Sequence, residues 1–185
     1  MAFKGQVLHN PFTGDRYEFL ATLTDTDGEF VKIKVTLGFK GIPMLNHIHL
    51  YQDERFEVIY GKLIVMAEGD LFMLYPGDAK EFPKNQPHNH YNGHNSRTVY
   101  IQTVAPALDF EYLLETLDGL GREGKIRNGR IGFLQKMVLL KYIDSKRVLA
   151  DVPMRLQNVL VNTFAPIGRI LGHRAIYKKY SGIEK

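Results

Sequence analysis

The chain has 185 residues, carries a formal net charge of +4 and contains no cysteine. This length suits one domain with a short extension, and the hydrophobic and charged fractions of 44% and 24% exclude a disordered or fibrous protein. The lack of cysteine excludes a disulfide scaffold, thiolate metal ligands and a cysteine nucleophile. The N-terminal segment lacks the apolar core of a signal peptide, and no apolar run is long enough for a membrane span, so we expect a soluble, cytoplasmic protein.

Charge is divided unevenly along the chain. Residues 1–121 contain 10 Lys and Arg against 16 Asp and Glu, a balance of −6, whereas residues 122–185 contain 14 against 4, a balance of +10. Opposite charge in two segments indicates two structural roles. The basic segment can pack against the acidic one or against a partner subunit, and nucleic acid or anionic lipid would also attract it. Composition does not choose between them.

The first hundred or so residues have the pattern of short strands. In residues 30–37, apolar residues alternate with Lys32, Lys34 and Thr36, which is the period of a half-buried strand. Similar stretches, rich in β-branched or aromatic residues, occupy 17–23, 56–60, 62–67, 71–75 and 98–104. Turn signals separate them, and the strand pattern ends near Pro106. This spacing predicts a mainly β protein, an antiparallel sandwich or barrel.

Beyond Pro106 the pattern changes to that of helices. A short helix is predicted over 110–117, with Glu111 and Glu115 exposed, then a loop over 119–129 and a helix over 131–143. Asp151 can cap a further helix that has Pro153 in its first turn. We expect Pro166 to end or kink that helix. The C-terminal part is therefore predicted to be a helical appendage.

The loop predicted over 119–129 contains glycines spaced like a dinucleotide-binding fingerprint. Residues 119–124 read Gly-Leu-Gly-Arg-Glu-Gly. That motif binds pyrophosphate only between a strand and a helix, whereas a predicted helix precedes it here. We therefore reject a nucleotide site.

Histidines are concentrated in one part of the chain. Five of the seven lie between residues 47 and 94. His47 and His49 are two apart on a predicted strand, so their side chains share a face. Glu54 follows closely, and His88, in another predicted strand, can complete the group. Three imidazoles and one carboxylate would bind a divalent metal and leave coordination positions open for chemistry.

These histidines lie in two stretches that resemble the two motifs of the cupin superfamily. The first reads Gly41-IPMLN-His47-I-His49-LYQD-Glu54-RFEVIY-Gly61, and the second reads Gly77-DAKEF-Pro83-K-Asn85-QP-His88-NHY-Asn92. Asn85 stands where the family usually has glycine, and asparagine tolerates the left-handed conformation better than most residues. The resemblance covers residues from about 8 to 108.

The resemblance implies a cupin double-stranded β-helix, or jelly-roll barrel, over residues 1–108, followed by a basic helical extension over 109–185 that packs on the barrel or on a partner subunit. It implies one divalent metal ion (iron, manganese, nickel, zinc or copper) inside the barrel, held by His47, His49, Glu54 and His88. The family includes dioxygenases, oxalate-degrading enzymes, sugar isomerases, epimerases and non-catalytic binding proteins, and its members often pair through their sheets. Fold and ligands alone do not name a reaction.

Strand alternation gives further candidates for a substrate pocket. If Glu54 faces inward, Tyr60 shares its side of the strand. If Tyr100 faces inward, so does Gln102, whereas the opposite phase would place their neighbours inside. His90 lies two residues after His88, and we interpret it as a pocket residue or as a rim histidine that orients a ligand.

We therefore predict a metal-dependent enzyme, dioxygenase-like or isomerase-like, that acts on a small polar carbonyl, carboxylate or enediol compound. No separate general base is evident. The alternative is a non-catalytic module that binds a small molecule and contacts a partner or a membrane surface through its tail. Apolar residues within 131–140, beside Lys136 and Lys141, would suit a peripheral membrane contact, but packing on the barrel or in a homodimer is the favoured interpretation. The tail has no recognisable nucleic-acid motif, so nucleic acid is not expected as a partner.

Overall fold

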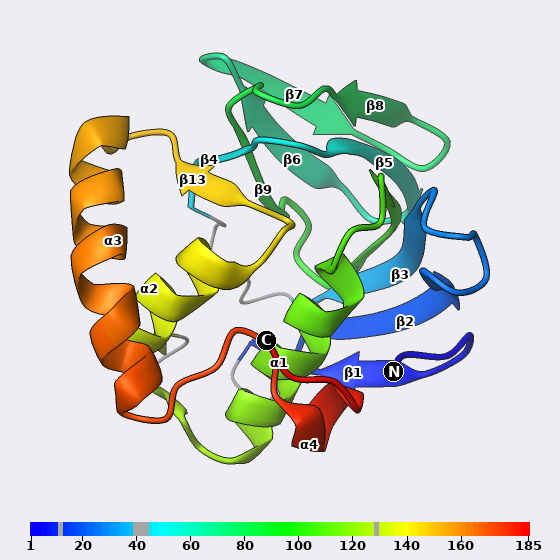
Figure 1. The fold of residues 1–185 in the computed structure, drawn as a ribbon. Helices are drawn as coiled ribbons and strands as arrows, with labels where there is room; N and C mark the ends of the chain where they lie inside the picture. The colour runs from blue at the N-terminus through cyan, green and yellow to red at the C-terminus, as the bar shows by residue number, and fades with distance from the viewer. Residues whose placement is uncertain (11–12, 39–44, 128–129) are drawn as a thin grey trace.

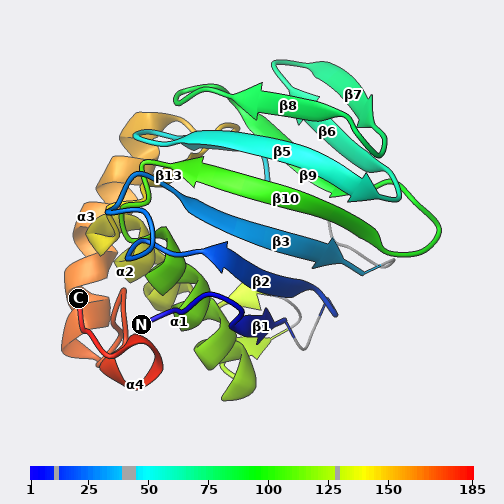
Figure 2. The ribbon, with the colours of Figure 1, turned by 90° about the vertical axis from the view of Figure 1, so that its right-hand side faces the viewer.

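The fold consists of two antiparallel sheets with helices beside them, as Figures 1 and 2 show from two sides. The computed structural model describes residues 1–10, 13–38, 45–127 and 130–185. The larger sheet has six strands in the order β1 (Val7–His9), β2 (Arg16–Ala21), β3 (Val31–Leu37), β10 (Thr98–Ala105), β5 (Asp53–Tyr60) and β8 (Ala79–Phe82). The smaller sheet has five, in the order β13 (Arg147–Leu149), β4 (His47–His49), β9 (His88–Asn92), β6 (Leu63–Ala67) and β7 (Asp70–Leu74).

The helices all follow the last long strand. They are α1 (Phe110–Arg122), α2 (Phe133–Tyr142), α3 (Met154–Ile170) and the short α4 (Lys178–Ser181), and a small hairpin of β11 (Ile126–Arg127) and β12 (Arg130–Ile131) lies between α1 and α2. The prediction of a mainly β, double-stranded β-helix fold with C-terminal helices is confirmed. Within the described residues, no helix combines the length and the apolar character that crossing a bilayer would need.

The barrel core forms because apolar residues alternate along the strands. In β3 every second residue, from Val31 to Leu37, is buried, and in β10 Thr98, Tyr100, Gln102 and Val104 face the same interior. The largest fully buried side chains of this core are aromatic: Phe19, Phe56, Phe82, Tyr100 and Phe110. Burying such side chains stabilises the fold by roughly 2 kcal/mol each. Their burial also fixes which face of each strand points inward, and therefore which polar residues on that face point inward too.

A second apolar core lies between the helices. Met137, Val138 and Leu139 of α2 are buried and pack with Ala165 of α3. Gly168 lets α3 pack closely against α2, because a Cβ at this position would lie 2.7 Å from a methyl carbon of Val138. Much of the apolar surface noted at residues 131–140 is therefore covered inside the molecule, which agrees with packing rather than with a membrane face.

The C-terminal segment also contributes a strand to the barrel. β13 pairs antiparallel with β4, with Arg147 opposite His49 and Leu149 opposite His47. No strand was predicted between the two long helices of the tail. The extension therefore completes one edge of the smaller sheet, beside the histidines.

Helix α1 corrects two predictions. It continues to Arg122, through residues expected in a loop, and Gly119 lies where a Cβ would come within 2.4 Å of the Tyr180 ring. Glu111 and Glu115, expected at the surface, are buried because the N-terminal segment covers this face of the helix. The Glu111 carboxylate accepts a hydrogen bond of 2.8 Å from the Leu23 N–H. Burial raises the pKa of both carboxyl groups.

Helix α3 corrects two more. Pro153 occupies the N-cap position and no side chain caps the helix, because the Asp151 carboxylate instead accepts a hydrogen bond of 3.1 Å from the Asn46 amide. Pro166 does not end the helix, since α3 continues to Ile170, so of the two expectations at this proline, an end or a kink, the first is wrong. Ala165, just before Pro166, and Gly168, two residues after it, are buried, and this tertiary packing outweighs the one backbone hydrogen bond that proline removes.

Candidate metal centre

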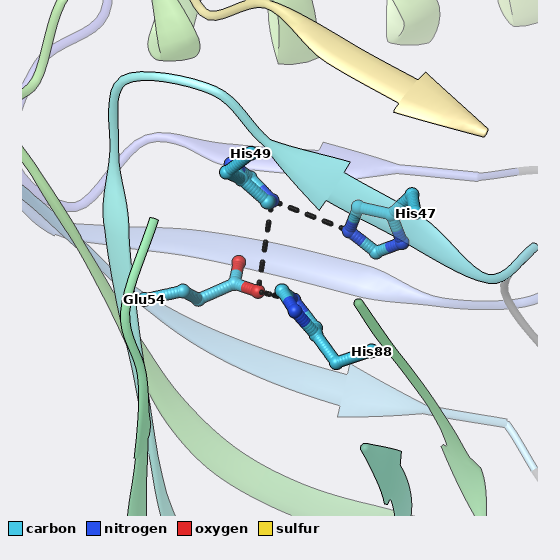
Figure 3. Close-up of side chains that lie close together, drawn as sticks. All are labelled: His47, His49, Glu54 and His88. Carbon is cyan, nitrogen blue, oxygen red and sulfur yellow. Dashed lines mark hydrogen bonds and ion pairs between the residues drawn. The ribbon is translucent and has the colours of Figure 1, made fainter. Parts of the chain in front are cut away.

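Four buried side chains converge inside the barrel from three strands. His47 and His49 come from β4, Glu54 from β5 and His88 from β9, and their side chains point toward one another (Figure 3). One potential ligand atom of each lies within 4.8 Å of the others. None of the four residues is more than 6% exposed. The structure thus brings together the four residues that the sequence analysis grouped.

The ligand atoms themselves lie at short distances. The Nε2 atoms of His47 and His49 are 3.2 Å apart. Glu54 Oε2 lies 2.8 Å from His88 Nε2 and 3.7 Å from His49 Nε2. Three imidazole nitrogens and one carboxylate oxygen therefore surround one small volume.

Backbone carbonyls set the orientation of two of the rings. His47 Nδ1 lies 2.9 Å from the Leu45 carbonyl oxygen, and His88 Nδ1 lies 3.0 Å from the Gln86 carbonyl oxygen. A carbonyl only accepts, so Nδ1 carries a proton in both rings and Nε2 is directed at the centre. A cation bound there would take the Nε2 lone pair of His88 in place of its hydrogen bond to Glu54. His49 Nδ1 is buried without a hydrogen-bond partner in the part of the chain that the structure describes.

The protonation states suit a cation. Burial, together with the nearby Arg147, lowers the pKa of His47 and of His49 to about 3. Burial alone would raise the pKa of Glu54, but His49 and the hydrogen bond from His88 outweigh it, so the pKa lies well below its usual value. At neutral pH the group therefore holds neutral imidazoles at His47 and His49 and an ionised carboxylate, which metal binding requires. This donor set fits a divalent transition metal.

Two motif residues adopt the left-handed backbone conformation, and one of them contacts the centre. Asn85 adopts a φ of 70°, the left-handed conformation expected in place of glycine, and its N–H donates to the His49 carbonyl at 2.8 Å. Gly61 has a φ of +84°, and a Cβ there would lie 2.8 Å from the Arg97 carbonyl oxygen. Gly41, the first residue of the first motif, lies outside the described residues.

The structure places three of the four pocket candidates inside the barrel. His90, Tyr100 and Gln102 are buried. The Tyr100 hydroxyl lies 2.8 Å from His90 Nε2, and the Gln102 amide donates a hydrogen bond to Glu54 Oε1. Of the two phases left open for β10, the inward one is that of Tyr100 and Gln102.

Tyr60 departs from the expected pattern. It is 49% exposed, and it lies opposite Val99 where the pairing of β5 with β10 shifts register: Tyr100 pairs with Val58, so Ile59 is the extra residue. Such a bulge reverses the alternation at the end of the strand. Tyr60 consequently packs its ring near that of His94 at the surface, 6.1 Å between centroids.

A cavity of about 300 Å³ lies beside Gln102, the residue whose amide bonds to Glu54. The four candidate ligands themselves are not among the described residues that line it. His90, Tyr100 and Gln102 form its barrel side, and Arg147 of β13 also lines it. Apolar residues from α1 and the small hairpin form much of the opposite wall: Leu114, Leu117, Ile126 and Ile131. Sequence reasoning missed Arg147, because one arginine in a basic tail gives no signal before its strand is known.

Comparison with known proteins gives partial matches. No protein-family model matches the chain. Quercetin 2,3-dioxygenase from Bacillus subtilis (strain 168) is 31% identical over 106 residues, which are 57% of this chain and 31% of that protein. The chain thus spans about a third of the length of this curated relative.

Two solved structures are also similar over part of the chain. KdgF from Halomonas sp. is 22% identical, covering 53% of this chain and 84% of that one, with a TM-score of 0.47. A cupin-superfamily sugar phosphate isomerase from Silicibacter pomeroyi is 25% identical, covering 50% and 59%, with a TM-score of 0.42.

Proposed function

The chain belongs to the cupin superfamily, and from this premise we propose that it is a metal-dependent enzyme acting on a small polar carbonyl, carboxylate or enediol compound. The observation that carries the proposal is the buried group His47, His49, Glu54 and His88, whose ligand atoms lie within 4.8 Å of one another. The partial relative is a dioxygenase by name, which supports oxygen-dependent chemistry as the first reaction class to test, with isomerisation as the second.

In this proposal the four residues hold iron, manganese, nickel, zinc or copper. When bound, such an ion supplies Lewis-acid chemistry, and a redox-active one also supplies oxygen chemistry. Gln102 orients the carboxylate, because its amide donates to the Oε1 atom of Glu54. The oxygen Oε2 is then left to face His49 and His88.

His90 and Tyr100 provide a polar pair beside this group. Burial lowers the pKa of His90 to about 4 and raises the pKa of Tyr100 well above its usual value. Both are therefore neutral at pH 7. The Tyr100 hydroxyl and His90 Nε2 share a hydrogen bond of 2.8 Å, and we propose that the hydroxyl is its donor. That leaves the proton of the imidazole on Nδ1, a buried atom with no partner within the described ranges. We propose that this N–H donates a hydrogen bond to a ligand oxygen.

Elemental analysis of protein purified without added metal or a metal-affinity tag tests the proposal. We expect about one equivalent of iron, manganese, nickel, zinc or copper in the wild type. His49→Ala should lose it, whereas His94→Gln, a change at an exposed histidine, should retain it. Wild-type protein that contains no metal and takes none up on reconstitution would overturn the proposal.

The cavity supports one alternative, a non-catalytic module that binds a small molecule. Its wall of apolar side chains suits retention of a ligand as well as turnover. A screen of metal-loaded protein against oxygen-dependent and isomerase substrates separates the two. Turnover that disappears in His49→Ala supports the enzyme, and tight binding without turnover supports the module.

We also propose a homodimer. Exposed apolar side chains on the edge strand β7, Leu71 at 50% and Met73 at 52%, support pairing of two copies through this sheet. Sedimentation equilibrium should give twice the chain mass of 21.2 kDa, and Leu71→Lys should give the monomer. A monomeric wild type would refute this.

A further inference from the structure

Arg147 extends from the C-terminal segment into the barrel. It lies directly opposite His49 in the β13–β4 pair, and residues opposite one another on antiparallel strands present their side chains on the same face. Its guanidinium lies over the Phe110 ring, 4.8 Å from the centroid. The residue also lines the cavity, together with Tyr17, Tyr100 and other residues.

Among the residues that the structure describes, this guanidinium has no anionic partner. Its Nε is buried without a hydrogen bond, and no ion pair to Arg147 is formed within the part of the chain that the structure describes. The Asp15 carboxylate, which also lines the cavity, is occupied by the Gly38 N–H at 2.9 Å and the Thr13 hydroxyl at 2.6 Å. Glu54 is occupied by His88 and Gln102.

Arg147 is half-buried and its Nε is fully buried, and a charge held partly out of water without an anionic partner is costly to the fold. Burial lowers the pKa of Arg147, while Glu54 and Tyr17 oppose that effect, and arginine stays protonated at any ordinary pH. The cation would be stabilised by an anion that enters the cavity from solution. A guanidinium is well suited to that, because its donors bind the two oxygens of a carboxylate side by side.

We propose that Arg147 binds the carboxylate group of the ligand, whose apolar body lies against the wall formed by Leu114, Leu117, Ile126 and Ile131. The inference deepens the proposed function and rests on it, because it takes the ligand to be the small molecule that binds beside the proposed metal ion. A divalent ion on the single carboxylate Glu54 would leave one net positive charge, and Arg147 would add a second beside it. The substrate class then becomes an organic carboxylate with an apolar body, selected by a residue of the C-terminal segment.

Isothermal titration of the purified full chain with benzoate, phenylacetate and hexanoate, each compared with its neutral amide, tests the proposal. We expect the wild type to bind at least one carboxylate more tightly than the matching amide. Arg147→Met keeps an apolar stem and should weaken carboxylate binding by about 10- to 100-fold, the range for a charge-assisted hydrogen bond, while amide binding stays unchanged. Arg147→Lys should lose less, since it keeps the charge but not the planar fork.

Arg155→Met is the matched control, because Arg155 is exposed on α3, and it should behave as the wild type. The inference is overturned if none of the three carboxylates binds better than its amide. It is also overturned if Arg147→Met binds carboxylate as tightly as the wild type does. If Arg147→Met does not fold, Arg147→Lys takes its place in this comparison. Metal content separates this outcome from failure of the proposed function. Arg147→Met should keep its metal, whereas a metal-free wild type that still prefers carboxylates would refute the metal proposal alone.

Discussion

The two sides of the cavity differ in how their polar groups are satisfied. On the barrel side, the charged Glu54 has bonds to His88 and Gln102, and Tyr100 has His90. Two groups there lack a partner among the described residues, His49 Nδ1 and His90 Nδ1, and both are uncharged ring nitrogens. On the side built by residues beyond 108, Arg147 has no anionic partner among the described residues and lies among mostly apolar side chains. Side chains held in place by hydrogen bonds to one another can bind an ion at a fixed position. A charge without a partner, beside an apolar wall, can instead bind a ligand that has an anionic group and an apolar body. We therefore expect metal affinity to depend on the barrel and ligand preference on the C-terminal segment.

The largest effect is expected from a substitution on the barrel side that removes a candidate metal ligand. Glu54→Gln keeps the shape of the side chain but removes the only carboxylate of the group, so metal affinity should fall by more than about 100-fold, beyond the range for residues that only support a ligand. Competition with a chromogenic chelator measures it. Glu57→Gln, an exposed position on the same strand, is the control. Retention of metal by Glu54→Gln would show that the histidines alone suffice.

A smaller loss is expected from the residue that orients Glu54. Gln102→Leu removes the donor to Oε1 and should reduce metal affinity by about 10- to 100-fold without removing a ligand. The same chelator titration applies. Thr103→Val, on the opposite face of β10, should leave the affinity unchanged. Equal affinities for Gln102→Leu and the wild type would assign Gln102 to packing alone.

Acid should destabilise the metal-free protein. The folded-state pKa values of His47 and His49 are about 3, below the ordinary 6.5, so the unfolded chain takes up protons first as the pH falls. Their contribution to stability is complete above pH 6.5 and is lost progressively below it, by about 1.4 kcal/mol per pH unit for each histidine at most. Urea unfolding of chelator-treated protein between pH 7 and 5 measures this. A constant free energy of unfolding across that range would contradict the assignment.

The two tyrosines considered for the pocket give the smallest effects and a direct contrast. Tyr100→Phe removes the hydrogen bond to His90 and should cost about 1 kcal/mol of unfolding free energy. Tyr60→Phe, at an exposed position, should stay within about 0.5 kcal/mol of the wild type. Thermal or urea unfolding of both variants under one condition provides the comparison. A larger effect at Tyr60 than at Tyr100 would contradict the register of β5.

The barrel was predictable because its signals are local. The alternation in β3 and the two-residue spacing of His47 and His49 follow from the geometry of a strand, and the motif resemblance added Glu54 and His88 to them. The phase of β10 remained open in the sequence, since both alternations are apolar, and only burial of Tyr100 and Gln102 resolved it. Tyr60 was misplaced because a bulge leaves no periodic signature.

The C-terminal segment was less predictable because its structure is set by contacts distant in sequence. Gly119 reads as a loop residue, yet it lies in a helix where the Tyr180 ring needs the space of a missing side chain. Pro166 reads as a helix end or kink, yet α3 continues past it to Ile170, with Ala165 and Gly168 buried against α2. β13 has three residues, too few for a strand pattern, and its place depends on β4, about a hundred positions earlier in the chain.

The pairing of β13 with β4 also bears on solubility and domain engineering. Without residues 147–149, β4 would be the outermost strand of its sheet, and its free N–H and C=O groups would be open to strands of other molecules. A shortened chain that ends at the barrel would therefore tend to self-associate through the strand that carries two of the four candidate ligands. For this reason the C-terminal segment should be retained in any attempt to transplant or minimise the site.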